Sequence, residues 1–180
     1  MPPAVDKGPN VEGSQAAAVL VPLYDADGDT TVVLIKRPET MPSHQGEIAF
    51  PGGKFEAGVD ADLRATALRE AHEEVGLDPA DVEIVARLDG IGTVASRFTI
   101  TPYVGFLAGP PVLTPNPREV VRILEIRLSE LLDPDAYREE RWGTDTADFD
   151  VHFYDLEDET VWGATARILT SFLAHLVAGR

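Results

Sequence analysis

Seven short runs of β-branched and aromatic residues, set against only two long helical segments, constrain the fold of this chain more than any other feature. Turn residues bound each run, as is usual for strands of a sheet. The predicted strands cover residues 16–24, 31–37, 47–50, 82–88, 99–107, 122–127 and 148–156. Helices are expected at 61–75, which is followed by Gly76, and at 164–177, where apolar residues recur at helical spacing. The pattern predicts an α+β fold, an α/β/α sandwich with a mixed sheet and two main helices.

The bulk composition fits one globular domain. We expect residues 1–14 to form a disordered lead-in without the features of a signal peptide, and residues 15–180 to form a single domain. The 15 basic residues are scattered among 31 acidic ones, which argues against nucleic-acid binding, and the apolar runs are too short to span a membrane. The absence of cysteine excludes disulfides and is compatible with the cytoplasm. With a net charge of −16, a phosphate-bearing ligand would need cations to bridge it to the protein.

Three glutamates on the first helix form the most informative cluster. Glu70, Glu73 and Glu74 stand at positions i, i+3 and i+4, so their side chains project from one face. Like charges at these spacings repel each other and destabilise the helix. Converging carboxylates suit Mg²⁺ or Mn²⁺, which prefer oxygen ligands. The ordinary alternative is a solvated acidic face, relieved in part by pairing between Arg69 and Glu73.

The segment from Arg69 to Leu77, with the glycines at 52 and 53 before it, resembles the Nudix hydrolase signature Gly-x5-Glu-x7-Arg-Glu-U-x-Glu-Glu-x-Gly-U, where U is a bulky aliphatic residue. Residues 69–77 match the second half, with Ala71 a small residue at the first U. In the first half, Val59 stands where the signature has Glu, and the loop before Arg69 is two residues longer. Three acids are candidates to replace the missing one: Glu56, Asp60 and Asp62.

The resemblance implies a role for each matching residue. Glu70, Glu73 and Glu74 would bind a divalent metal together with the carbonyl of Gly53. Arg69 would orient Glu73 without binding the metal itself. The residues expected to be catalytic are Glu73, Glu74 and Glu119, and the proton acceptor would be either Glu74 or Glu119. We interpret His72 as a bystander, because its position on the helix differs from that of the glutamates.

A second resemblance, to the coenzyme A pyrophosphatases of the family, extends over about residues 16–175. Its motif is similar to Leu34-Ile35-Lys36-Arg37 followed by Gly46-x3-Phe50-Pro51-Gly52-Gly53, and further similarity lies at 116–120 and 161–169. Lys36, Pro38 and Pro42 depart from the motif, and Pro42 replaces an arginine that would suit the 3′-phosphate of coenzyme A. Either His44 or Arg37 would compensate. The expected substrate-binding residues are Arg37, His44, Gly46, Gly52 and Lys54.

These resemblances imply hydrolysis of a diphosphate bond in coenzyme A or an acyl-CoA, giving 4′-phosphopantetheine and adenosine 3′,5′-bisphosphate. The alternatives are a broad hydrolase of nucleoside diphosphate derivatives such as ADP-ribose, NADH or dinucleoside polyphosphates, and a Nudix-fold module that senses a nucleotide without cutting it. A protein-interaction domain explains the glycines less well. The partner would be a small nucleotide, and the sequence leaves open a homodimer. We expect Trp162 and Ile168 to belong to the core.

Overall fold

The computed structural model describes residues 13–40, 45–93, 97–143 and 148–179, so residues 1–12 of the expected lead-in lie outside the described residues. The helices are α1 (Leu63–Val75), the short α2 (Leu128–Leu131), α3 (Gly163–Ala178) and a 3₁₀ turn, η1 (Pro79–Asp81). The strands are β1 (Gln15–Ala26), β2 (Asp29–Lys36), β3 (Ile48–Ala49), β4 (Gly52–Lys54), β5 (Glu83–Arg87), β6 (Ile91–Gly92), β7 (Phe98–Leu107), β8 (Arg122–Arg127), β9 (Tyr137–Gly143), β10 (Asp148–Asp155) and β11 (Thr160–Trp162).

Eight of these strands form one mixed sheet, whose central path is β3-β2-β1-β7-β5. The long strands β1 and β7 run parallel at its centre, and the other pairs are antiparallel. β4 pairs with the first half of β1, while β2 pairs with the second half. β4 therefore lies beside the middle of the sheet, and a loop of residues 55–62 joins it to the helix that carries the glutamates.

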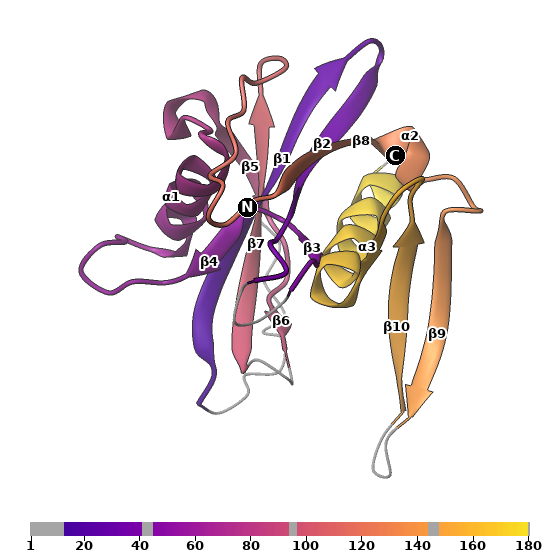
Figure 1. The fold of residues 1–180 in the computed structure, drawn as a ribbon. Coiled ribbons are helices and arrows are strands. Elements are labelled where there is room, and N and C mark those ends of the chain that lie inside the picture. The colour runs from indigo at the N-terminus through magenta and orange to yellow at the C-terminus, as the bar shows by residue number, and fades with distance from the viewer. Residues whose placement is uncertain (1–12, 41–44, 94–96, 144–147, 180) are drawn as a thin grey trace.

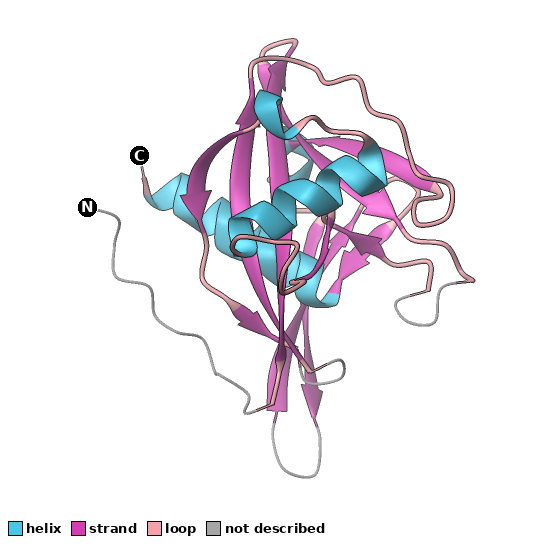
Figure 2. Ribbon diagram, turned by 90° about the vertical axis from the view of Figure 1, so that its left-hand side faces the viewer, coloured by secondary structure: helices cyan, strands magenta, loops and turns pink. Residues whose placement is uncertain are grey.

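The two main helices cover opposite faces of this sheet (Figure 1). Figure 2, in which the α1 side faces the viewer, shows that helix lying across the strands. The apolar residues form two clusters, one packed under α1 around Ala67, Ala71 and Val75, and the other under α3 around Leu169 and Phe172. The predicted α+β sandwich is confirmed. No helix within the described ranges is long and apolar enough to cross a membrane.

The ends of α1 follow from its capping residues. Asp62 caps the helix by accepting a hydrogen bond from the backbone N–H of Ala65, and the helix begins at Leu63, two residues later than expected. Gly76 ends it with φ of 72°, a left-handed conformation in which glycine carries no Cβ penalty. The helix therefore ends at Val75, one residue beyond Glu74, as the sequence predicts.

A second, three-stranded sheet, β11-β10-β9, contains a strand that was not predicted and a tryptophan whose predicted burial is wrong. β9 was not expected, because its residues are largely charged and every one is exposed, so it lacks the alternation that marks a half-buried strand. The prediction that Trp162 belongs to the core is wrong: the residue is 42% exposed, and its ring lies 6.5 Å from that of Trp142. Ile168 is buried, as expected.

Candidate metal and catalytic site

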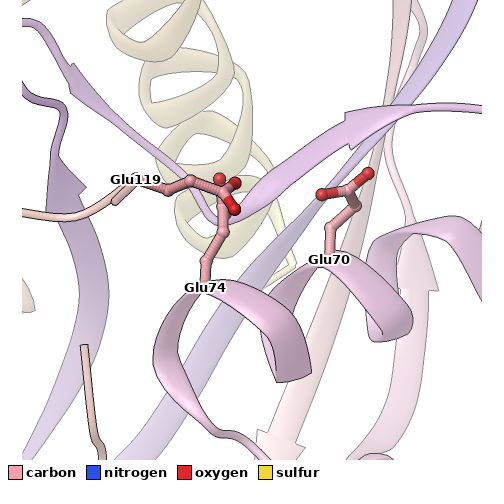
Figure 3. A group of neighbouring side chains, drawn as sticks. All are labelled: Glu70, Glu74 and Glu119. Atoms are coloured by element: carbon pink, nitrogen blue, oxygen red, sulfur yellow. The ribbon is translucent and has the colours of Figure 1, made fainter. Parts of the chain in front are cut away.

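Three carboxylates from two distant parts of the chain meet beside α1. Glu70, Glu74 and Glu119 each offer an oxygen atom, and these atoms all lie within 4.8 Å of one another. Figure 3 shows Glu70 and Glu74 rising from the same side of the helix, one turn apart, while Glu119 enters from a loop and its carboxylate meets that of Glu74. We call these three residues the carboxylate trio. Oxygen ligands at this spacing suit a Mg²⁺ or Mn²⁺ ion.

Glu74 is the most buried member of the trio, with a side chain that is 1% exposed. One carboxylate oxygen accepts a hydrogen bond of 2.9 Å from the backbone N–H of Gly52, and the other lies 3.8 Å from an Arg37 nitrogen. Burial raises the pKa of Glu74 to about 8, and the nearby acids Glu70 and Glu119 add to this rise. Arg37 and the N–H of Gly52 oppose this rise only in part, and a divalent cation would supply further positive charge.

Glu70 is held differently. Burial raises its pKa, whereas the adjacent guanidinium of Arg69, with a nitrogen 3.0 Å from its oxygen, opposes the rise. On the other side lies the backbone of Gly53: a Cβ built on that glycine would lie 2.5 Å from the carboxylate carbon of Glu70. The absence of a side chain at position 53 is therefore what allows this strand to approach the trio.

Of the three candidates for the acid missing from the signature, Asp60 is the one that pairs with Arg69. Its two oxygens accept hydrogen bonds of 2.8 and 3.0 Å from Nε and Nη2 of Arg69, and they also accept from the Thr66 hydroxyl and the Glu56 N–H. This bidentate pair holds the pKa of Asp60 well below its usual range. Of the other two candidates, Asp62 caps the helix and Glu56 is exposed.

Arg69 links this pair to the glutamates. Its Nη1 lies 3.0 Å from Glu70 and 3.1 Å from Glu73, so the expected contact with Glu73 is present but is one of several. The Glu73 side chain is 49% exposed, and it is not part of the carboxylate trio. Its role as metal ligand and catalytic residue stays a prediction. The imidazole Nδ1 of His72 lies 3.2 Å from the carbonyl oxygen of Leu77, at the end of the helix, in keeping with a bystander.

Two glycine substitutions should distinguish a loss of activity from a loss of stability. In Gly53→Ala the new methyl group meets the end of a flexible side chain, so we expect Glu70 to be displaced and activity to fall at least about tenfold, with little loss of stability. In Gly52→Ala the Cβ would lie 2.4 Å from the carbonyl oxygen of Ala18 and 2.6 Å from the Cα of Val19, both backbone atoms. That variant should lose stability, measured as a lower midpoint of thermal unfolding. Equal behaviour of the two variants would contradict this account.

The expected substrate-binding residues are only partly brought together. Arg37 reaches the trio, and its buried Nε makes no hydrogen bond to the described residues. Such an unsatisfied donor suits an incoming phosphate oxygen. The ammonium of Lys54 lies 5.3 Å from the centre of the Phe98 ring, and Gly46 has φ of 64° in the turn between β2 and β3. His44 and Pro42 lie outside the described residues.

Lys36, which precedes Arg37 and departs from the coenzyme A pyrophosphatase motif, forms an ion pair within the protein. Its ammonium donates a hydrogen bond of 2.6 Å to Glu159, in the turn between β10 and β11. Arg122 approaches the same carboxylate at 3.8 Å. This ion pair fastens the small sheet to the end of β2. The lysine is therefore committed to a contact within the protein, and Arg37 is the basic residue of this segment that contacts the trio.

Comparison with known proteins identifies the family to which this arrangement belongs. The model of the NUDIX domain matches residues 14–153, which include β4, α1 and the loop that carries Glu119. The chain belongs to the Nudix family. Nudix hydrolases act on diphosphate bonds and generally need divalent metals.

Two curated Nudix relatives align with most of the chain. Nudix hydrolase 22, chloroplastic, of Arabidopsis thaliana is 40% identical over 85% of this chain and 52% of its own length. The peroxisomal coenzyme A diphosphatase NUDT7 of Mus musculus is 37% identical over 92% of this chain and 70% of its own. The chain thus spans about half the length of the plant protein. Both relatives are named for organelles, so the cytoplasmic location stays a prediction.

A solved structure supports the fold independently of sequence. The MutT/nudix family protein from Enterococcus faecalis superposes with a TM-score of 0.61 at 16% identity, over 96% of this chain and 66% of the other. At this identity the likeness concerns the fold. It includes the C-terminal part of this chain, beyond the residues that the family model matches.

Proposed function

We propose that this chain hydrolyses the diphosphate bond of a nucleoside diphosphate-linked metabolite, with coenzyme A or an acyl-CoA as the first candidate. The observation that carries the proposal is the carboxylate trio with Arg37 beside it. Carboxylates that can bind a divalent metal ion and a guanidinium group that can bind phosphate lie at the same place. The mouse relative named as a coenzyme A diphosphatase supports the choice of substrate. The motif around Arg37 and Phe50 supports it from the sequence.

In this proposal each side chain has a separate task. Glu70 and Glu74 hold the cation, with Glu73 and the Gly53 carbonyl as further candidate ligands. A bound divalent ion neutralises the nonbridging oxygens and lowers the pKa of its water. Arg37 binds a nonbridging phosphate oxygen through its unsatisfied Nε. Lys54, Gly46, Gly52 and His44 remain the other candidate contacts to the substrate.

We assign the proton acceptor to Glu119 in preference to Glu74. Glu119 is only partly buried and comes from a loop, so water can reach it, whereas Glu74 is enclosed and already accepts the N–H of Gly52. As water attacks phosphorus, its proton passes to the Glu119 carboxylate. The bond between the attacked phosphorus and the bridging oxygen breaks, and the bridging oxygen leaves as part of the other phosphate. The products are two phosphate monoesters.

The substrate assignment is tested by the products. Incubated with Mg²⁺ or Mn²⁺, wild-type protein should convert coenzyme A into 4′-phosphopantetheine and adenosine 3′,5′-bisphosphate, identified by mass spectrometry. ADP-ribose, NADH and a dinucleoside polyphosphate should be assayed in parallel. Intact coenzyme A beside consumed ADP-ribose would favour the broader hydrolase and overturn the assignment. No turnover of any diphosphate, together with tight nucleotide binding, would favour the sensing module.

A further inference from the structure

The loop that carries Glu119 is fastened to the C-terminal end of α1 through the helix backbone. The N–H of Thr114 donates to the carbonyl of Val75, and the N–H of Asn116 donates to the carbonyl of Glu74, each at 2.8 Å. These carbonyls lie in the last turn of the helix, where the helix itself offers them no partner. Asn116 is thus bonded through its backbone to one member of the carboxylate trio.

The side chain of Asn116 is directed at another member of the trio. Its Oδ1 accepts the N–H of Arg118, which closes a local turn, and its Nδ2 donates to a carboxylate oxygen of Glu119, both at 3.2 Å. The Arg118 N–H can only donate, so the oxygen of the amide must face it and the NH₂ group must face Glu119. The Asn116 carbonyl also accepts the N–H groups of Glu119 and Val120.

We propose that Asn116 is a positioning residue for the reaction, whose amide holds the Glu119 carboxylate at the trio. The inference rests on the proposed function. The need for such a residue follows from the charges, since three carboxylates with oxygens within 4.8 Å repel one another. Glu70 and Glu74 are fixed by a helix, whereas Glu119 belongs to a loop and has several rotatable bonds. A hydrogen bond to an ionised acceptor restricts those rotations and opposes the repulsion.

The substitution Asn116→Asp tests the amide while keeping the turn. Aspartate has the same shape and can still accept the Arg118 N–H, but it replaces the NH₂ donor with an oxygen that repels Glu119. We expect kcat for coenzyme A to fall about 10- to 100-fold, as for other residues that orient ligands, with KM changed less than about threefold. The thermal unfolding midpoint should stay close to that of the wild type. Should this variant fail to fold, Asn116→Ser keeps a weaker form of the turn and is too short to reach Glu119.

A double-mutant cycle with Glu119→Gln decides whether Asn116 acts through Glu119. In the Glu119→Gln background, Asn116→Asp should cause less than about a twofold further loss of kcat, because the carboxylate to be positioned is gone. A wild-type kcat in Asn116→Asp, or the same loss in both backgrounds, would overturn the proposal. Wild-type protein that cleaves no diphosphate would instead refute the proposed function, so the two failures are distinguishable.

Discussion

Replacement of Glu74 by glutamine is expected to lower kcat at least about 1000-fold, because Glu74 is the most buried member of the carboxylate trio and a bound cation contributes several kcal/mol to the barrier. Glutamine has nearly the same volume and can still accept the N–H of Gly52. The fold should therefore persist, as judged by circular dichroism. Glu83→Gln, an exposed change on β5, is the matched control and should leave kcat within about twofold.

The pH dependence of stability provides a second readout for the same variant. The pKa of Glu74 is raised from 4.5 to about 8 in the folded protein, so without divalent ions the folded state keeps a proton that the unfolded chain has released. The free energy of unfolding should therefore fall as pH rises from about 4.5 to 8, by at most about 1.4 kcal/mol per pH unit. Glutamine has no proton to lose, so Glu74→Gln should flatten this slope. If urea unfolding gave the same slope for the wild type and for Glu74→Gln, Glu74 would be ionised at every pH in this range. If Glu74→Gln kept about 90% of the wild-type kcat, Glu74 would have no part in the mechanism.

Removal of Asp60 should cause the largest loss of stability among the acids of this region. Its side chain is 2% exposed and forms a bidentate pair with Arg69, which is 18% exposed, so Asp60→Ala leaves a mostly buried guanidinium without its main partner. Loss of one member of a buried pair costs about 3–5 kcal/mol. The free energy of unfolding from urea titration measures this directly. Activity should fall as well, since Arg69 contacts Glu70 and Glu73.

The control for Asp60 comes from the same loop. Glu56 is exposed and its side chain makes no hydrogen bond or ion pair within the described part of the chain, so Glu56→Ala should change stability by less than about 0.5 kcal/mol. The low pKa of Asp60 adds an acid dependence: its contribution is present above the unfolded value near 4 and is lost as pH falls toward the folded value. Equal losses in the two variants, or a loss below about 1 kcal/mol in Asp60→Ala, would contradict the assignment of Asp60 as the missing acid.

The helix of the site could be predicted almost completely because its information is local. The three glutamates, Arg69 and the Gly76 terminator lie within one continuous segment, and helical spacing alone places the carboxylates on one side. The observed helix differs from the prediction by two residues at its start, where Asp62 is the cap. The hairpin between β1 and β2 is local as well, because its turn, in which Gly28 has φ of 81°, joins strands that are adjacent in the sequence.

Contacts between distant segments could not be read from the residues alone. Three acids competed for the pair with Arg69, and only the path of the longer loop selects Asp60. Glu119 was named through family resemblance, but the residues that bring it to Glu74 are the backbone bonds of Thr114 and Asn116, which no residue pattern reveals. Similarly, an exposed and charged strand such as β9 has no hydrophobic alternation, so it was not predicted. The exposure of Trp162 was not predicted either.

Diffraction at the manganese absorption edge, from crystals soaked in Mn²⁺, tests the central claim most directly. We expect an anomalous peak within coordination distance of the oxygens of Glu70 and Glu74, and its loss in crystals of Glu74→Gln. Ordered carboxylates with no peak beside them at millimolar Mn²⁺, or a peak that persists unchanged in the variant, would show that Glu70 and Glu74 do not hold the cation and would contradict the account.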